Sequence, residues 1–359
     1  MVVRGAKKAV RRDWSSLPPE LLNLIANNLR EISDFVRFRA VCTAWRFSIS
    51  TMDFPPQFPW ILKEREYPYN EPHMLFYSTT SSKMYTIHAP KYLGKRFFGS
   101  SQGYILIELC DRATKRFLSS RHTCQISLLN PLNNHEIPLP ACNFGYDPFW
   151  IGPQKYQVGK YLVCSGYRGR NRSKTAFCCL GQDNWCEFEL TCPGYKWFHL
   201  NNMLFGIELN TGVTKVTDMA TGILAYVIQS IDRYDAGAEQ YLVDVSGDIL
   251  IVFHHYDYDI DTCYDWFDVH RLDLIGSGSP CWVKVNSIGN QALFIDEYSC
   301  FALGASDISG VKANCIYHIE PSSWVKKVDI ETGDEESLHC PFKEADRWFF
   351  PNLEHLRAQ

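Results

Sequence analysis

Residues 17–46, "LPPELLNLIANNLREISDFVRFRAVCTAWR", carry apolar side chains at helical spacing, whereas the rest of the 359-residue chain has a different pattern. Leu21, Leu24 and Ile25 recur at intervals of three and four, which places them on one side of a helix. The later residues form short runs rich in Val, Ile, Tyr and Phe between Gly, Asn and Asp, a pattern typical of strands and turns. A helical segment this short cannot bury a core of its own, so the chain combines a small helical unit with a large β domain.

The helical segment divides into three short helices. Pro18 and Pro19 suit a first turn, where the missing N–H would have no partner, and Ser33 or Asp34 can cap a second helix. A third helix falls within "AVCTAWRFSI" (40–49). The three helices carry more apolar surface than they can cover among themselves. Spacing alone leaves two interpretations, a helical cap on the β domain or a docking module for another protein.

Composition excludes several classes of protein. Hydrophobic residues make up 46% of the chain, which is typical of a globular protein. Residues 1–50 carry a net charge of +5 and the remainder −9, without the dense basic face of a nucleic-acid binder. No apolar run reaches the roughly 18 residues of a membrane helix, so no membrane partner is expected.

The cysteines indicate a reducing compartment. The chain has 14 Cys and no C-x-x-C, which favours free thiols and a cytoplasmic or nuclear location. The sequon at Asn171 is then expected to stay unmodified. The basic start "MVVRGAKKAVRR" reads as a solvated tail, with a nuclear address or a transit-peptide fragment as alternatives.

Weak internal repeats predict the architecture of the β domain. "SSQGYILIE" (100–108) aligns with "DVSGDILIV" (244–252), and each is followed by another strand and a polar turn. "CIYHIEPSSWVKKVDIETGD" (315–334) repeats the form, and 204–222 is a looser copy. Repeated strand–turn units of roughly 45 residues are typical of β-propeller blades, and residues 70–350 would make about six. An irregular sandwich or barrel is the alternative.

The front of the chain resembles an F-box. The resemblance rests on the Leu-Pro start, the aliphatic residues of the first helix, and "DFVRFRAVCTAWR" (34–46). It implies binding to a Skp-type adaptor and, through it, to cullin and RING subunits of a ubiquitin ligase. Arg39 and Arg46 also match the motif and, as charged residues, are expected only to frame its edge. By position, the residues that the resemblance assigns to the adaptor are Leu17, Pro18, Leu21, Leu22, Ile25, Leu29, Val41, Cys42 and Trp45.

The β domain extends the resemblance over nearly the whole chain. "LLNPLNNHEIPLP", "CWVKVNSIGNQALFID" and "VKANCIYHI" are similar to phrases of a plant family of F-box proteins with a C-terminal domain of unknown function. This sequence has His318 where that family usually has an aromatic residue, and "PLNN" lacks the usual Thr-Gly turn. Neither change affects the expected role.

No string in the sequence predicts catalysis, a cofactor or a metal site. Asp257, Asp259 and Asp261, with Asp265 and Asp268, follow calcium-loop spacing, but Thr262 stands where that loop needs Gly and no helices flank it. A solvated hairpin tip explains the stretch better. His254 and His255 alternate faces of a strand and cannot both bind one metal ion.

One basic segment is a candidate for binding a target. "YRGRNRSK" (167–174) concentrates positive charge in one predicted hairpin loop, which could hold an acidic peptide, a phosphate or RNA. A solvated loop tip is the more ordinary interpretation. The basic residues are Arg168, Arg170, Arg172 and Lys174.

Together these observations predict a three-helix F-box followed by an all-β domain, a β-propeller of about six blades. The expected divisions are a basic tail (1–13), the F-box (14–52), a Pro-rich linker (53–69), the propeller-like target-binding domain (70–352) and a C-terminal tail (353–359). The expected function is that of a non-catalytic substrate receptor of an SCF-type E3 ubiquitin ligase, with an unknown protein as target. The alternatives are an adaptor-bound interaction protein that acts without degradation, and a propeller enzyme.

Overall fold

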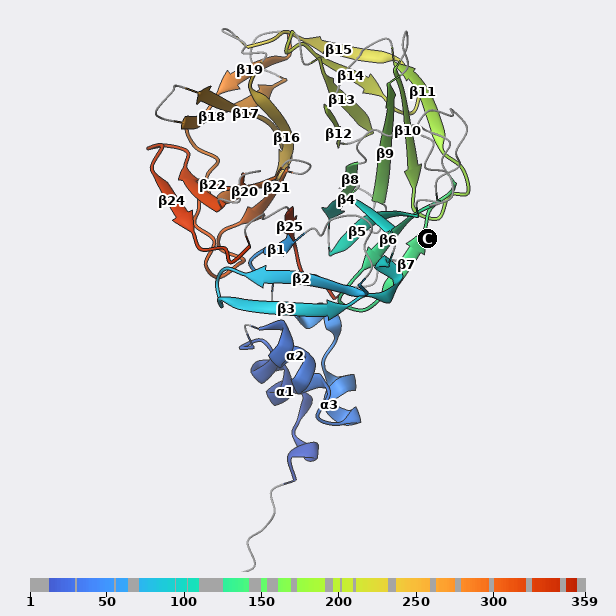
Figure 1. Cartoon of the computed structure of the whole chain (residues 1–359), viewed down its shortest axis with the longest axis vertical. Coiled ribbons are helices and arrows are strands. Elements are labelled where there is room, and N and C mark those ends of the chain that lie inside the picture. The colour runs from blue at the N-terminus through green and yellow to red at the C-terminus, as the bar shows by residue number, and fades with distance from the viewer. Residues whose placement is uncertain are drawn as a thin grey trace, which may run out of the picture. The chain divides into compact units, whose positions relative to one another are not determined.

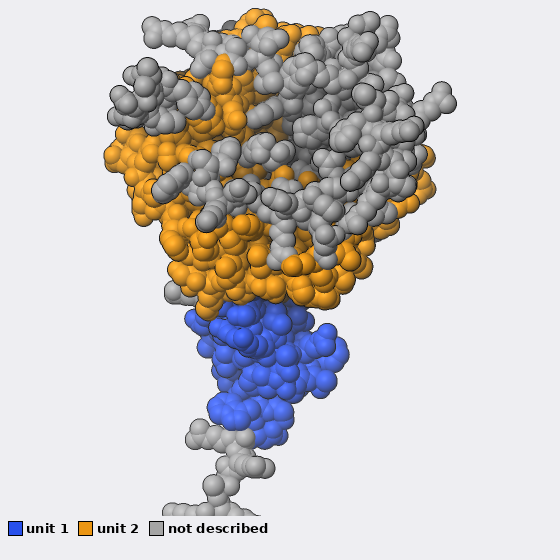
Figure 2. All heavy atoms as spheres, viewed as in Figure 1, with its two compact units in different colours: residues 1–57 blue, residues 58–359 orange. Residues whose placement is uncertain are grey.

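The computed structural model of the chain describes most of residues 13–353. The residues in this range that it leaves undescribed are 30, 55, 64–70, 94, 102, 110–124, 142–149, 154–160, 169–172, 191–195, 201, 209–210, 232–236, 259–262, 275–278, 297–299, 321–324 and 343–346. The chain forms two compact units, residues 1–57 and residues 58–359 (Figure 2).

The described part of unit 1 is helical. It contains α1 (Pro19–Ala26), α2 (Ile32–Arg39) and α3 (Thr43–Ser48), with single 3-10 turns at Trp14–Ser16 and Thr51–Asp53. α3 contacts both other helices. The side chains that fill the space between them are Leu22, Ala26, Ile32, Phe35, Trp45 and Ile49. The three helices expected from the apolar spacing are therefore present.

The described strands of unit 2 form six antiparallel or mixed sheets. Sheet A contains β25 (Arg347–Phe349), β1 (Trp60–Lys63), β2 (His73–Ser78) and β3 (Lys83–His88). Sheet B contains β4 (Lys95–Ser101), β5 (Tyr104–Leu109), β6 (Gln125–Asn130) and β7 (His135–Pro138). A 3-10 turn, Pro90–Tyr92, joins these two sheets.

The middle of the unit contains two further four-stranded sheets. Sheet D consists of β8 (Trp150–Pro153), β9 (Tyr161–Arg168), β10 (Ser173–Cys179) and β11 (Cys186–Leu190). Sheet E consists of β12 (Lys196–Leu200), β13 (Met203–Ile207), β14 (Thr214–Asp218) and β15 (Leu224–Ile228).

The last two sheets follow in chain order. Sheet F contains β16 (Glu239–Val245), β17 (Asp248–Tyr258), β18 (Cys263–Asp273) and β19 (Cys281–Lys284). Sheet G has the order β21 (Cys300–Gly304), β20 (Gln291–Ile295), β22 (Cys315–Ile319), β23 (Val325–Asp329) and β24 (Glu335–Leu338). Within sheet G, β20 and β22 run parallel.

The six sheets are arranged as the blades of a propeller (Figure 1). One strand of each blade contacts its counterpart in the next, in the series β25, β4, β8, β12, β16 and β21. β1 pairs with β2 on one side and with β25 on the other, so the two ends of the domain complete one blade together. The expectation of about six blades is confirmed, and the sandwich or barrel alternative is not what the chain forms.

The apolar core lies between neighbouring blades. Phe58, Phe294, Tyr317 and Trp348 pack in one buried cluster between sheets A and G. The Trp348 indole donates its N–H to the Ile295 carbonyl oxygen at 3.1 Å. Residues near both ends of the β domain share this cluster. The contacts that close the ring of blades therefore also bury large aromatic side chains.

The two aligned repeats of the sequence form equivalent hairpins. Gly103 lies in the turn between β4 and β5, and Gly247 lies in the turn between β16 and β17. Both have positive φ, +81° and +105°, which favours glycine in tight hairpin turns. The repeat in the amino-acid sequence therefore corresponds to a repeat of turn geometry.

The divisions of the chain differ from the expected ones at one boundary. β1 (Trp60–Lys63) lies inside residues 53–69, the stretch expected to be a linker. In the sequence, the boundary between the two units falls between Gln57 and Phe58. Proline-rich composition suggested a linker, but Phe58 and Trp60 are buried core residues of unit 2.

Candidate functional sites

Helix α1 has an inner side and an exposed apolar side. Leu22 and Ala26 are buried, whereas Leu21, Leu24 and Ile25 are exposed. Residues three and four apart lie on the same side of a helix, so these three leucine and isoleucine side chains form one apolar stripe. Leu21 keeps 47% of its surface exposed, and although a single exposed leucine is ordinary, a stripe of three large apolar side chains is typical of an interaction surface.

The α2–α3 turn adds a second apolar exposure. Val41 is 59% exposed and immediately precedes Cys42, which is half-buried. Trp45 is instead buried within unit 1, where its indole N–H donates to the Trp14 carbonyl oxygen at 3.0 Å and its ring packs on Phe38. Trp45 therefore holds the helices together.

The nine residues assigned to the adaptor fall into three groups. Pro18, Leu21, Ile25 and Val41 are exposed; Leu17, Leu29 and Cys42 are half-buried; Leu22 and Trp45 are buried. Helical spacing could not separate these groups, because in helices of two turns the inner and outer sides adjoin. Among the described residues of this unit, four further large apolar side chains are exposed and absent from the expected set: Trp14, Leu24, Val36 and Phe47.

The two arginines of the motif differ in their surroundings. Arg39 is half-buried and its Nε donates to the Ile49 carbonyl oxygen at 3.0 Å, tying α2 to the end of α3. Burial, together with the positive charge of Arg46, lowers the pKa of Arg39, which nevertheless stays charged at neutral pH. Arg46 is exposed.

The basic segment of the sequence falls at the end of the β9–β10 hairpin. Arg168 is the last residue of β9 and pairs with Ser173, and Lys174 follows in β10 opposite Tyr167. Arg170 and Arg172 lie outside the described residues. The backbone thus places the ends of this basic segment at one hairpin, as expected from the sequence.

The β17–β18 hairpin presents its two histidines to opposite faces. His254 pairs with Phe267 and His255 with Trp266, so their side chains alternate as expected for a strand. The imidazole of His255 stacks on Trp266 and approaches Asp268 at 3.3 Å. His254 points the other way, toward sheet G.

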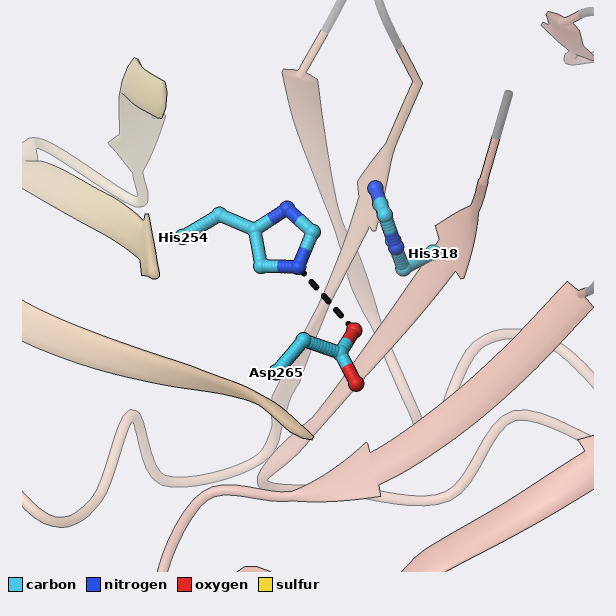
Figure 3. A group of neighbouring side chains, drawn as sticks. All are labelled: His254, Asp265 and His318. Carbon is cyan, nitrogen blue, oxygen red and sulfur yellow. Dashed lines mark hydrogen bonds and ion pairs between the residues drawn. The ribbon is translucent and has the colours of Figure 1, made fainter. Parts of the chain in front are cut away.

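His254, Asp265 and His318 form a buried cluster between sheets F and G (Figure 3). The Nε2 atom of His254 lies 3.0 Å from Oδ2 of Asp265. The His318 ring, from β22, meets the His254 ring edge to face with centroids 4.4 Å apart. Lys326 Nζ donates to the other Asp265 oxygen, Oδ1, at 2.8 Å, and to Glu320 at 2.7 Å.

The charges of this cluster are strongly perturbed. Burial would raise the pKa of Asp265, but hydrogen bonds from His254 and Lys326 and their charges hold it well below its usual range. Burial, reinforced by neighbouring His254, lowers the pKa of His318 to about 3, so its imidazole is neutral at pH 7. Burial opposes the charge of Lys326, yet Asp265 and Glu320 hold its pKa above the ordinary value.

The calcium-like spacing of 257–268 does not become a converging set of carboxylates in the part that the structure describes. Asp265 binds His254 and Lys326, while Asp268 binds Lys284 at 2.5 Å and faces His255. The two carboxylates thus serve opposite faces of β18. Asp259 and Asp261 lie outside the described residues.

No helix in the described part of the chain is both long enough and apolar enough to cross a membrane. Among the described cysteines, Cys42 and Cys315 have free thiols.

Comparison with known proteins agrees with this architecture. The model of the F-box domain matches residues 14–57, and the model of the KIB1-4 beta-propeller matches residues 76–343. The second match covers most of the chain. The chain belongs to the plant F-box proteins that carry a KIB1-4 beta-propeller.

Relatives from Arabidopsis thaliana share both parts. F-box protein At2g26160 is 24% identical over 86% of this chain and 96% of its own length. Putative F-box protein At3g25750 is 25% identical over 86% of this chain and 87% of its own length. Among solved structures, the GH93 alpha-L-arabinofuranosidase of Fusarium graminearum covers 70% of this chain and 82% of its own, with 13% identity and a TM-score of 0.38. A likeness at that level says nothing about activity.

Proposed function

We propose that this protein is the substrate receptor of an SCF-type E3 ubiquitin ligase. Its F-box would bind a Skp-type adaptor, which connects it to the cullin and RING subunits, and its propeller would hold a protein target. The exposed apolar stripe of α1 supports the proposal most directly, because three large side chains face solvent on a helix that has a buried side of its own.

The energetics favour a partner at this stripe. Full burial of an aliphatic side chain contributes roughly 1.5–3 kcal/mol. The exposed side chains here are already partly covered, so a partner gains only part of this free energy from each of them. They are Leu21, Leu24, Ile25 and Val41. Even so, their sum is comparable to the losses of freedom that association costs, and a specific complex becomes possible.

The contribution of this subunit is proximity. A receptor that holds target and ligase together raises the effective concentration of the target at the transferring enzyme, and needs no residue that makes or breaks bonds. The β9–β10 hairpin with Arg168 and Lys174 is the proposed contact for an acidic segment of the target. Cytoplasmic and nuclear compartments, where such ligases act, are the proposed location.

The test is co-purification of the full-length chain with a recombinant plant Skp-type adaptor. Leu21→Asp with Val41→Asp places two charges on the exposed stripe while leaving the buried side of the helices unchanged. We expect capture to fall at least tenfold relative to the wild type. Ile223→Asp, an equally exposed apolar residue of unit 2, is the matched control and should bind like the wild type.

Trp45 is a poor choice for this experiment, because it is buried and its loss would unfold unit 1 rather than remove a contact. Normal capture by the Leu21→Asp/Val41→Asp variant, or no capture by the wild type, would refute adaptor binding through this face. Adaptor capture with unchanged cellular lifetimes of co-purifying proteins would instead favour an interaction protein that acts without degradation.

A further inference from the structure

We infer that His254, Asp265 and His318 form a binding site for a divalent transition-metal ion, of which Zn²⁺ is the type, between sheets F and G (Figure 3). The ion would join the β17–β18 hairpin of one blade to β22 of the next. This role is independent of adaptor binding.

The geometry places three ligand atoms around one point. One ring nitrogen of each histidine and one oxygen of Asp265 lie within 4.8 Å of one another. Ligands of a tetrahedral Zn²⁺ ion stand about 3.4 Å apart, given bonds of about 2.1 Å. The His254–Asp265 pair, at 3.0 Å, already meets this spacing, and the ligand atom of His318 has to approach by at most about 1.4 Å.

The hydrogen bonding of the cluster is incomplete without a ligand. Nδ1 of His318 is buried and has no hydrogen-bond partner, although this side chain is almost wholly excluded from solvent. Buried polar atoms are normally paired, and each exception calls for a physical cause. A bound ion supplies one, because it takes up the lone pair of an imidazole nitrogen that no protein donor reaches.

The outer partners suit a metal-bound carboxylate. Lys326 holds only Oδ1 of Asp265 and leaves Oδ2 directed at the histidines. Ligating carboxylates are commonly fixed in this way by a second hydrogen bond. Around the site, three linked carboxylates, those of Asp265, Glu320 and Glu335, face the one ammonium group of Lys326, and a divalent cation balances this excess of acidic groups.

The donor set selects the class of ion. Two imidazole nitrogens and one carboxylate oxygen suit Zn²⁺, Co²⁺ or Ni²⁺, whereas Ca²⁺ and Mg²⁺ prefer sites made of oxygen atoms. A water molecule completes a three-ligand site of this kind. The buried position between blades favours a structural role over a catalytic one.

The experiment is a Co²⁺ titration of the full-length, chelator-treated protein, followed by its visible absorption bands. We expect one equivalent of Co²⁺ with a nitrogen–oxygen spectrum and without the thiolate-to-cobalt band that the cysteines would give. Zn²⁺ should compete with Co²⁺ and raise the Tm of the protein by several degrees, because it binds the folded state alone.

The variants separate this site from other histidines. His318→Phe, which retains a buried ring, and Asp265→Asn should each weaken Co²⁺ binding by more than the roughly 10- to 100-fold that loss of an outer partner causes. His255→Gln, on the opposite face of the same strand, should retain it. His73→Ala removes the exposed His73–His88 pair as a competing surface site. This variant should also retain Co²⁺ binding.

Absence of Co²⁺ binding by the wild type would overturn the site and leave the cluster as a hydrogen-bonded pair with ordered water. Undiminished binding by both His318→Phe and Asp265→Asn, each folded by circular dichroism, would overturn it as well. If His318→Phe does not fold, the nearly isosteric Asp265→Asn variant and the Zn²⁺-dependent Tm of the wild type decide the question.

Discussion

Gly103 is the residue at which turn geometry and packing act together most directly. Its φ of +81° is one that side-chain-bearing residues rarely adopt, and an added Cβ would lie 2.6 Å from Cβ of Asn352. Asn352 belongs to the end of the described chain, where its carbonyl oxygen accepts a hydrogen bond from Asn130. The turn of sheet B and the C-terminal segment therefore fit closely at this glycine.

Gly103→Ala should reduce the free energy of unfolding by about 2–4 kcal/mol, because strain in the left-handed region adds to a steric clash. Gly333→Ala is the matched control. Gly333 has a φ of +74° but nothing within 4 Å of an added Cβ, so its replacement should cost only about 1 kcal/mol. Urea unfolding followed by tryptophan fluorescence measures both, and equal losses would show that packing at Gly103 contributes nothing.

Glu136 makes the propeller sensitive to acid. Lys95 Nζ and Ser127 Oγ each donate to the Glu136 carboxylate at 2.7 Å, and Lys91 lies at 3.7 Å. Burial opposes ionisation, but these hydrogen bonds and lysine charges lower the pKa of Glu136 below its ordinary value of 4.5. The folded state therefore releases this proton more readily than the unfolded state does.

The stability from Glu136 is present above pH 4.5 and is lost as the pH falls through the lower, folded-state pKa. For this partly exposed group we expect a loss on the order of 1 kcal/mol or less. Glu136→Gln should be less stable than the wild type at pH 7, and the difference should shrink between pH 4.5 and pH 3 when Tm is measured across that range. A difference in Tm that stays constant over this interval would show that ionised Glu136 does not stabilise the folded state.

At the scale of the element, β25 closes the ring. It pairs with β1, and Trp348 inserts between sheets A and G while its backbone N–H donates to Oδ2 of Asp296 at 2.9 Å. Its backbone carbonyl oxygen accepts from Ser100 Oγ at 2.6 Å. One three-residue strand thus links the first blade, the second and the last.

Trp348→Ala should lower the free energy of unfolding by about 3–5 kcal/mol, since it empties a fully buried site and removes the indole hydrogen bond to the Ile295 carbonyl oxygen. Trp266→Ala, at a largely exposed tryptophan of β18, should cost about 1 kcal/mol or less. Guanidinium unfolding midpoints compare the two, and similar shifts would contradict the role of β25 as the closing strand.

Many of these helices and strands can be predicted from the amino-acid sequence. The apolar spacing of 17–46 indicated the helices, and the repeats around Gly103 and Gly247 indicated the blades, because both signals are local. The pairing of β25 with β1 and the parallel pairing of β20 with β22 join segments by contacts that no local pattern encodes.

The candidate sites were only partly predictable for the same reason. Alternation along the strand correctly separated His254 from His255, but the partner of His254 lies in another blade. His318 stood out only as a departure from the family's aromatic residue. In unit 1 the spacing indicated an apolar surplus, while the buried position of Trp45 depended on how three short helices pack.

At the scale of the whole molecule, the chain divides into two compact units, residues 1–57 and residues 58–359. The buried apolar side chains of unit 1 come from its helices and from Ile49 directly after α3, and those of unit 2 begin with Phe58, which packs on Phe294 and Trp348. We therefore propose that residues 1–57 bind the adaptor and residues 58–359 bind the target. A chain that starts at residue 58 should keep the strand-rich circular dichroism spectrum of the propeller.

The measurement that tests this division most directly is the Kd of a Skp-type adaptor for the full-length chain and for residues 58–359, determined by isothermal titration calorimetry. We predict specific binding to the full-length chain, and affinity at least 100-fold weaker for the folded propeller alone. Comparable affinity of the two, or no binding to the full-length chain, would contradict the assignment of unit 1 as the adaptor-docking unit.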